Sequence, residues 1–346
     1  MSIGPMNHTA PHGGRTARIG LWGASGSGKT SYLASLFVAV NQTQGRWNIV
    51  GVDKESVDFL AEKTDTLTRR RRFPLKTEGI QHLSWTVMGT TEQTVRERWR
   101  KRTETVPLHI QLDMIDAPGG YFKGAEEDEK AGEDLDIDID FNDAEDASAG
   151  GGNTPEDLID QLTECDGIIY LFDPLRENEH GDEFQHFQWA LQNIVHRAAQ
   201  NGTLDGMHLP HHLAVCITKL DAPKVFHTAS KRGCLTVDPD DPYLFPRVRD
   251  DKVEDLFRDL GRLSPTRSAL MVHDAIKASF HPGRVRYFAT SAVGFYLGRR
   301  ATRFRVADFQ NVIPDPDERQ KYAIRGDIHP INVLEPLLWL GQQTRR

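Results

Sequence analysis

The chain has 346 residues, of which 38% are hydrophobic and 27% are charged, and its formal net charge is −8. This length can bury a full hydrophobic core, so the fold needs no disulfide or metal to hold it. Three cysteines, an odd number without metal-ligand spacing, exclude a disulfide scaffold and favour a reducing, cytoplasmic setting. The first fifteen residues contain no apolar signal core, and no run of eighteen apolar residues occurs, so we expect neither secretion nor a membrane span.

Most of the negative charge is confined to one segment. Residues 124–152 include twelve acids and one lysine, a charge of −11 that leaves +3 for the rest of the chain. Neither part predicts a nucleic-acid partner. We expect 123–153 to be a disordered insert that attracts a basic partner surface. The alternating aspartates over 134–140 imitate a calcium loop, but Ile139 stands where that loop needs glycine, which favours disorder.

Hydrophobic patterning predicts alternating strands and helices. In chain order we expect a disordered arm (1–15), a strand (17–23), two helices (31–42 and 53–69), two strands (80–89 and 107–116) with a charged hairpin tip between them (91–104), a helix (155–165), a strand (167–174), a helix (183–199), a strand (212–221), two helices (251–261 and 265–279), a strand (284–292), a hairpin or excursion within 295–330 and a closing helix (331–343). This alternation predicts an α/β fold with a doubly wound, mostly parallel sheet and one antiparallel strand pair. We expect a single domain over 16–346, with excursions at 222–283 and 295–330.

A glycine-rich loop follows the first expected strand. Residues 23–30, GASGSGKT, match G-x-x-x-x-G-K-[ST] between a strand and a helix. Gly26 and Gly28 let backbone N–H groups turn toward phosphate oxygens, and the helix N-terminus favours the same anion. Lys29 can reach the β- and γ-phosphates, and the Thr30 hydroxyl can bind Mg²⁺. The predicted phosphate site consists of Ser25, Gly26, Ser27, Gly28, Lys29, Thr30 and Ser31.

Two later motifs predict which base is bound. Residues 218–221, TKLD, end an expected strand, and Asp221 there can accept two hydrogen bonds from guanine N1–H and N2–H₂, a donor pair that adenine lacks. The Lys219 stem can lie along the purine face. At the end of the next strand, in Thr290-Ser291-Ala292, a backbone N–H of Ser291 or Ala292 can meet guanine O6. Taken alone, a Lys-x-Asp sequence is often only a surface turn.

A further motif predicts contacts to the metal and the γ-phosphate. Asp116-Ala117-Pro118-Gly119 matches D-x-x-G at the end of a strand. Asp116 can hold the Mg²⁺ shell through water, and the Gly119 N–H can sense the γ-phosphate. The alternative is an ordinary Asp-Pro-Gly turn.

The four motifs, in this order, resemble the Ras-like, translation-factor-related class of P-loop GTPases. The resemblance implies GTP and GDP as ligands, Mg²⁺ as cofactor, hydrolysis of GTP, and two switch loops that recruit protein effectors or regulators. In that class a switch I threonine binds the metal and the γ-phosphate, and Thr77 in FPLKTEG is our choice for it. The catalytic residues so implied are Lys29, Thr77 and Gly119, and the metal ligands are Thr30, Thr77 and Asp116. The segments GLWGASGSGKTSYLASL, FPLKT and NVLEPLLWL are also similar to bacterial double-GTPase proteins of multi-component conflict or effector systems.

The chain departs from that class at two positions. Gly120 stands where Ras-like enzymes place a water-orienting glutamine, and Ser25 replaces a glycine at a point where a side chain would crowd an arginine finger. We therefore expect slow hydrolysis that depends on a partner, or a non-hydrolysing GTP-binding scaffold. One arginine of Arg69–Arg72 is a candidate internal arginine finger, with a solvated basic helix end as the alternative. Two further alternatives are a P-loop ATPase, which Asp221 disfavours, and a module that acts mainly through its insertions.

Overall fold

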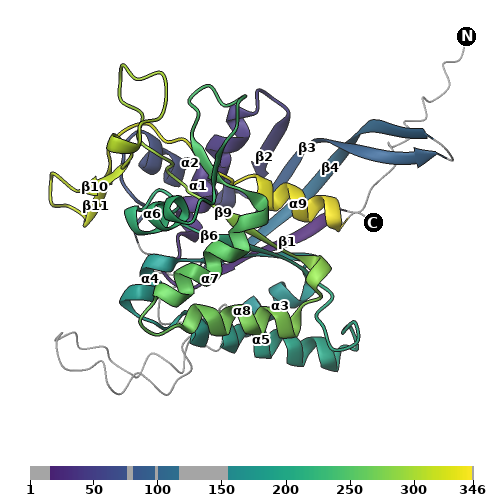
Figure 1. Ribbon diagram of the computed structural model, residues 1–346. Helices are drawn as coiled ribbons and strands as arrows, with labels where there is room; N and C mark the ends of the chain where they lie inside the picture. Colours follow the sequence, from purple (N-terminus) through teal and green to yellow (C-terminus); the bar gives the residue numbers. More distant parts are fainter. Residues whose placement is uncertain (1–15, 76–80, 98–99, 117–154, 345–346) are drawn as a thin grey trace, which may run out of the picture.

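The structure, a computed structural model, describes residues 16–75, 81–97, 100–116 and 155–344 (Figure 1). The expected N-terminal arm and the acidic insert lie outside these residues. The strands are β1 (Ala17–Gly23), β2 (Trp47–Gly51), β3 (Gln81–Glu97), β4 (Arg100–Asp116), β5 (Gly167–Phe172), β6 (His212–Ile217), β7 (Leu235–Val237), β8 (Pro246–Val248), β9 (Val285–Ala289), β10 (Val312–Pro314) and β11 (Tyr322–Ile324). The α-helices are α1 (Lys29–Gln42), α2 (Lys54–Thr68), α3 (Pro155–Glu164), α4 (Pro174–Glu179), α5 (Glu183–Gln200), α6 (Pro223–Lys231), α7 (Val253–Leu263), α8 (Ser268–Ser279) and α9 (Glu335–Gln343).

A seven-stranded sheet in the order β2-β3-β4-β1-β5-β6-β9 forms the centre of the molecule. Strand β3 runs antiparallel to both β2 and β4, and the remaining neighbours pair in parallel. The predicted fold class, α/β with a doubly wound, mostly parallel sheet and one antiparallel strand pair, is confirmed. The predicted pair is β3–β4, and β2 adds a second antiparallel pairing to β3. Two-stranded sheets, β7-β8 and β10-β11, lie outside the main sheet.

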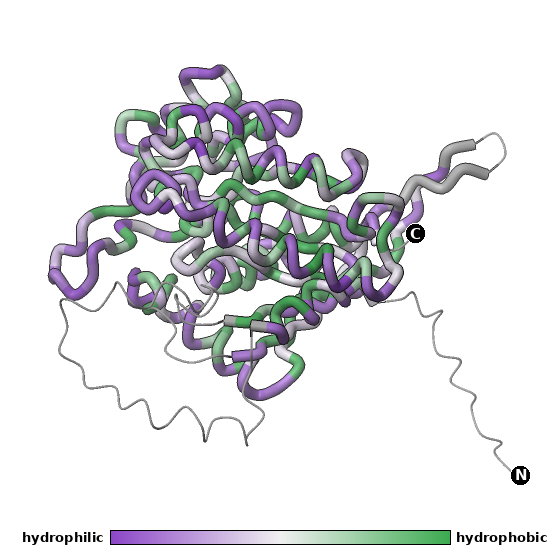
Figure 2. Tube along the Cα trace, turned by 90° about the horizontal axis from the view of Figure 1, so that it is seen from below, coloured by the Kyte–Doolittle hydropathy of each residue, from purple (hydrophilic) through white to green (hydrophobic). Residues whose placement is uncertain are grey.

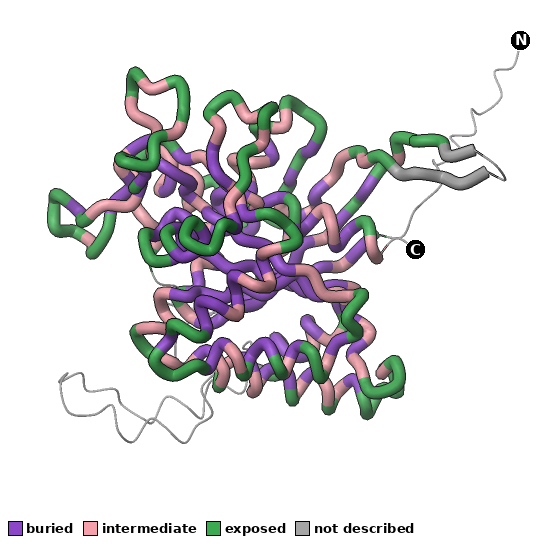
Figure 3. The backbone as a smooth tube through the Cα atoms, viewed as in Figure 1, coloured by how far each residue is buried: buried purple, intermediate pink, exposed green. Residues whose placement is uncertain are grey.

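Helices cover the two faces of the sheet and divide the core (Figures 1 and 2). Helices α3, α5, α7 and α8 pack on one face over β5 and β6, and α1, α2 and α9 pack on the other. Every residue of β5, GIIYLF, is buried, as expected for a central parallel strand between two helical layers. Figure 3 shows buried residues along the central strands and exposed residues on the outer loops and helices.

The carboxyl ends of four strands lie level with one another. Gly23 of β1 pairs with Leu171 of β5, Leu171 pairs with Cys216 of β6, and Cys216 pairs with Phe288 of β9. The loops that follow these strands therefore emerge at one edge of the sheet, where ligands bind in open α/β folds.

The charged stretch 91–104, expected as a hairpin tip, belongs mostly to the antiparallel β3–β4 pair, which confirms the hairpin. The two strands are longer than expected, with 17 residues each, and project beyond the sheet as a two-stranded ribbon. Other elements differ from those expected. The short β2, α4 and α6 were not predicted. Strand β6 ends at Ile217, so the TKLD residues form a turn beyond the strand. In the described part of the chain, no helix combines the length and the apolar character that a membrane crossing requires.

Candidate functional site

The glycine-rich loop joins β1 to α1 and needs its glycines for two reasons. Gly26 and Gly28 have φ of +75° and +98°, and a Cβ atom on either would meet nothing within 4 Å, so backbone conformation alone demands glycine there. At Gly23 the reason is space, because a Cβ atom would lie 2.6 Å from Ser27 Oγ and 2.8 Å from the Leu171 carbonyl oxygen. The loop backbone is thus shaped as a phosphate cradle requires.

Two polar side chains are buried in this loop. The Lys29 Nζ donates to the carbonyl oxygens of Gly23 and Ala24, at 3.0 and 3.4 Å, and Lys29 is only 8% exposed. The Ser27 hydroxyl is fully buried and has no hydrogen-bond partner within the residues that the structure describes. Because buried polar groups normally have partners, a buried ammonium and an orphan hydroxyl at a helix N-terminus fit a polyanionic ligand. Ser25, Thr30 and Ser31 are half-buried around them.

Asp221 and Ser291, which the sequence predicted for base recognition, touch each other. The Ser291 hydroxyl donates to Asp221 Oδ1 and accepts from the Gly294 amide at 2.8 Å. Asp221 is 6% exposed, and burial raises the pKa of its carboxyl, while the bonds from Ser291 and the Lys219 charge oppose that shift. An acid held in this way keeps a fixed direction, which is what recognition of two neighbouring N–H donors requires.

The turn that carries Asp221 is fastened to the loop after β9. The Leu220 amide donates to the Thr290 carbonyl oxygen at 3.0 Å, and the Ala222 amide donates to the Lys219 carbonyl oxygen at 2.9 Å. Lys219 has φ of +59°, a left-handed conformation that non-glycine residues rarely adopt. Its ammonium pairs with Asp173, the buried residue that follows β5.

The sequence predicted that a backbone amide of Ser291 or Ala292 contacts the base, and the structure leaves only Ala292 as a candidate. The Ser291 amide donates to the Ile331 carbonyl oxygen at 3.0 Å, and the Ile331 amide returns a bond to the Ser291 carbonyl oxygen at 2.9 Å. The Ser291 amide is therefore already bonded to Ile331, and Ser291 can affect a base only through the bond of its hydroxyl to Asp221. Ala292, which is half-buried, is the remaining candidate for a backbone contact to a base.

The predicted magnesium ligands are only partly described. Thr77 and Gly119 lie outside the described residues, as does Gly120. Asp116 ends β4. Because Leu21 of β1 pairs with Met114, the backbone of Asp116 lies at the level where β1 enters the glycine loop. Threonine hydroxyl and aspartate carboxylate oxygens are the types of ligand that suit Mg²⁺, which prefers oxygen ligands and retains water. Among the described residues, no group of three or more His, Cys, Asp or Glu could hold a metal ion.

The four consecutive arginines, Arg69–Arg72, all contact acids. Arg69 and Arg70, which follow α2, pair with Asp65 of that helix, Arg71 pairs with Asp327, and Arg72 pairs with Asp315 and Asp317. The Arg72 backbone also forms a bridge with Ala323 of β11. This arrangement favours a structural role, in which the segment after α2 is fastened to the β10-β11 excursion.

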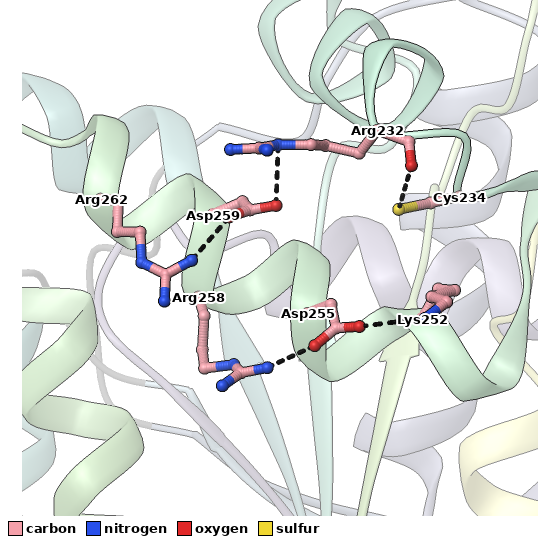
Figure 4. A pocket seen from close by; sticks show the side chains of 7 residues that line it. All are labelled: Arg232, Cys234, Lys252, Asp255, Arg258, Asp259 and Arg262. Atoms are coloured by element: carbon pink, nitrogen blue, oxygen red, sulfur yellow. Dashed lines mark hydrogen bonds and ion pairs between the residues drawn. The ribbon is translucent and has the colours of Figure 1, made fainter.

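A pocket of about 280 Å³ lies elsewhere, beside α7 (Figure 4). It is lined by Arg232, Cys234, Lys252, Asp255, Arg258, Asp259 and Arg262. Each of its four cations forms an ion pair with Asp255 or Asp259, so each of these two acids is shared by two cations and the wall keeps a positive surplus. None of these residues belongs to the glycine loop, the TKLD turn or the loop after β9.

Sequence reasoning missed Asp173. It follows a buried strand in the sequence FDP, and the signal was an aspartate directly before a proline at a strand end, which is typical of a helix N-cap. The structure gives Asp173 that capping role, together with the contact to Lys219. Asp173 lies near the turn 218–221 only because β5 and β6 are neighbouring strands in the sheet.

No known family profile matches the sequence, and no curated protein is significantly similar to it. Solved structures that align with the chain include Sup35 complexed with GDP, at 12% identity and a TM-score of 0.31, over 84% of this chain and 40% of that one. The GTPase-like domain of S. cerevisiae Ski7, bound to GTP, aligns at 10% identity and a TM-score of 0.33, over 80% and 43%. The signal recognition particle receptor SRb-GTP/SRX complex from Chaetomium thermophilum aligns at 12% identity and a TM-score of 0.30, over 81% and 92%.

The chain thus spans about two fifths of the Sup35 and Ski7 chains it matches. In this chain the glycine loop, the TKLD turn and the loop after β9 emerge at one edge of an α/β sheet.

Proposed function

We propose that this chain binds GTP together with Mg²⁺ at the sheet edge and hydrolyses it slowly to GDP. One observation carries the proposal: the glycine loop after β1 and the buried Asp221 after β6 lie at the same edge, with only β5 between their strands. Neighbouring strands are about 4.8 Å apart, so the two loops are separated by about 10 Å, the scale of a nucleotide. The glycine loop takes the phosphates and Asp221 selects guanine.

The roles of the individual groups follow from chemistry. Lys29 and the loop amides neutralise charge on the phosphates, and the N-terminus of α1 adds its dipole. Thr30 and Asp116 would hold Mg²⁺, with Thr77 completing the set. The metal, when bound, stabilises the charge that develops between the β- and γ-phosphates. Gly119 is the proposed sensor of the γ-phosphate.

The test compares nucleotide content and turnover with GTP and ATP side by side. We expect the purified protein to bind GTP and GDP, to discriminate against ATP, and to release phosphate from GTP slowly. The Lys29→Ala variant is the matched control, because activity that survives in it would come from a contaminating phosphatase. Equal binding of ATP and GTP would contradict the assignment of Asp221.

A non-hydrolysing GTP-binding scaffold is the second candidate function. The ion pairs of Arg69–Arg72 favour it, because the arginines that could serve as an internal finger are all paired with acids. Recovery of intact GTP from the purified protein would support this alternative, and multiple turnovers would exclude it. If an arginine acts in cis, its change to alanine slows single-turnover hydrolysis without weakening GTP binding; unchanged rates in all four variants would remove that role.

We also propose a cytoplasmic, partner-regulated switch in a bacterial multi-component system. The support is the motif resemblance of GLWGASGSGKTSYLASL and NVLEPLLWL to double-GTPase proteins. The test is co-purification of a protein partner that depends on whether GTP or GDP is bound. A partner retained equally in both states would contradict the switch.

A further inference from the structure

Lys219 and Asp173 meet across the ends of β6 and β5. The Lys219 ammonium forms an ion pair with Asp173 Oδ2. The Asp173 side chain is fully buried, whereas that of Lys219 is 40% exposed. Burying a carboxylate costs free energy that an ion pair rarely recovers as stability, so the contact with Lys219 is weak evidence for a purely stabilising role.

Asp173 is held in place independently of Lys219. Its Oδ1 accepts the Leu175 amide at 2.9 Å, which makes it the N-cap of α4. Its backbone carbonyl accepts the Glu177 amide at 3.0 Å. One carboxylate oxygen therefore fixes the group to α4, and the other is presented to the lysine.

The backbone of Lys219 is fixed as well. Its left-handed φ of +59° costs free energy and persists only where surrounding bonds impose it. Here the imposing bonds are those from Ala222 to Lys219 and from Leu220 to Thr290. Its backbone and its ammonium are both held, so the aliphatic stem runs between two fixed ends, and the side chain stays partly exposed. An apolar stem in a fixed position is a suitable platform for the flat face of a purine.

We propose that Asp173 is a positioning residue of the base site, which holds the Lys219 ammonium so that its stem faces the purine ring. The inference rests on the proposed GTP-binding function. The purine is recognised at its edge by Asp221 and on its face by the Lys219 stem. Because the stem is ordered before the ligand arrives, less conformational entropy is lost on binding.

The experiment measures the affinity of the full chain for GTP and for inorganic tripolyphosphate, which has no base. Asp173→Asn and Asp173→Ser both keep an oxygen for the helix cap but remove the charge. We expect both to weaken GTP binding by about twofold to fivefold, the range of a partly exposed ion pair, through faster dissociation. Tripolyphosphate binding should not change. Asp182→Asn is the control, because this acid precedes α5 and pairs with Arg176 instead.

A double-variant cycle separates positioning from a structural role. In Lys219→Met, which keeps the stem and loses the charge, adding Asp173→Asn should cost nothing further. Additive losses, an unchanged GTP affinity in both Asp173 variants, or an equal loss of tripolyphosphate binding would overturn the proposal. Loss of the folded state in both capping variants would also overturn it, since the charge would then serve the fold. A wild-type chain that binds tripolyphosphate but not GTP would instead defeat the proposed function.

Discussion

In the proposed nucleotide site, the glycine loop (residues 23–30) and the base-recognition turn (residues 218–221) would each hold one half of the ligand, by opposite means. In the glycine loop the space around Gly26 and Gly28 is open, and the backbone would provide the donors. At the turn after β6, the contact groups are side chains locked by other side chains, with Asp221 held by Ser291 and Lys219 held by Asp173. A phosphate is recognised by any correctly shaped backbone, whereas a base needs directed side chains.

The difference has a consequence for mutagenesis. Changes in the glycine loop should affect every phosphate ligand alike, while changes at the turn should affect only ligands that carry a base. Comparing GTP with tripolyphosphate therefore separates the two regions in a single assay.

The largest effect is expected from Lys29→Ala. This change removes the buried ammonium of the loop, and charge-assisted bonds to phosphate are among the strongest in proteins. We expect the affinity for both GTP and tripolyphosphate to fall by at least about 100-fold, as measured by calorimetry. Lys54→Ala is the control, since the side chain of Lys54 is 89% exposed. Retained tripolyphosphate binding in Lys29→Ala would mean that the loop is not the phosphate site.

Asp221→Asn should affect the contacts of the base and leave those of the phosphates unchanged. Replacing the carboxylate by an amide removes one acceptor and introduces a donor, which opposes guanine and suits the carbonyl oxygen of xanthine. We expect GTP affinity to fall by about 10- to 100-fold and the affinity for xanthosine triphosphate to rise, with tripolyphosphate unaffected. A variant that keeps its preference for GTP over xanthosine triphosphate would revive the ATPase alternative.

Ser291→Ala should produce a smaller loss of the same kind. The hydroxyl connects the Gly294 amide to Asp221, and without it both buried groups lose a partner. We expect the free energy of unfolding to fall by about 1–3 kcal/mol, together with weaker GTP binding. Chemical denaturation and nucleotide titration measure the two effects. If stability falls while GTP affinity stays the same, the serine supports the loop but does not aim Asp221.

The last effect concerns pH and lies outside the site. Burial raises the pKa of Glu183 to about 8, although Arg176 nearby opposes the shift. Between its ordinary value of 4.5 and that value, the folded chain keeps a proton that the unfolded chain has lost, so the free energy of unfolding declines as pH rises. This group contributes at most about 1.4 kcal/mol for each pH unit.

The variant Glu183→Gln should therefore decline less in stability than the wild type between about pH 5 and pH 8. Tyr170, which donates to Glu183 at 3.2 Å, can donate equally to the amide oxygen. Thermal denaturation across this range measures the slope for both proteins. Parallel slopes would show that Glu183 is ionised in the fold and neutralised by Arg176.

The sheet could be predicted from the sequence because its signals are local. Strand β5 is a continuous apolar run, and the glycine loop carries its own spacing. The helix start at Asp53 is likewise encoded locally, and the structure shows its carboxylate accepting the Ser56 amide at 2.7 Å. The α/β class and most of its helices followed from such features.

The remainder depends on contacts between distant segments. Strand β2 exists through its pairing with β3, which five residues of mixed polarity do not indicate by themselves. The partners of Arg71 and Arg72 lie about 250 residues further along the chain, so the sequence left open whether these arginines serve the fold or the chemistry. The meeting of Lys219 with Asp173 has the same origin, since strand order alone sets it.

One hydrogen bond limits how early in synthesis the first helix can reach its final packing. Tyr32, one turn beyond Lys29 on α1, donates its hydroxyl to the Val333 carbonyl oxygen at 2.6 Å, and α9 packs beneath β1 and β4 immediately afterwards. This contact of the helix that begins at the glycine loop can therefore form only after a segment some 300 residues later has left the ribosome. A nascent chain that has displayed all four sequence motifs still lacks the support under the first of them.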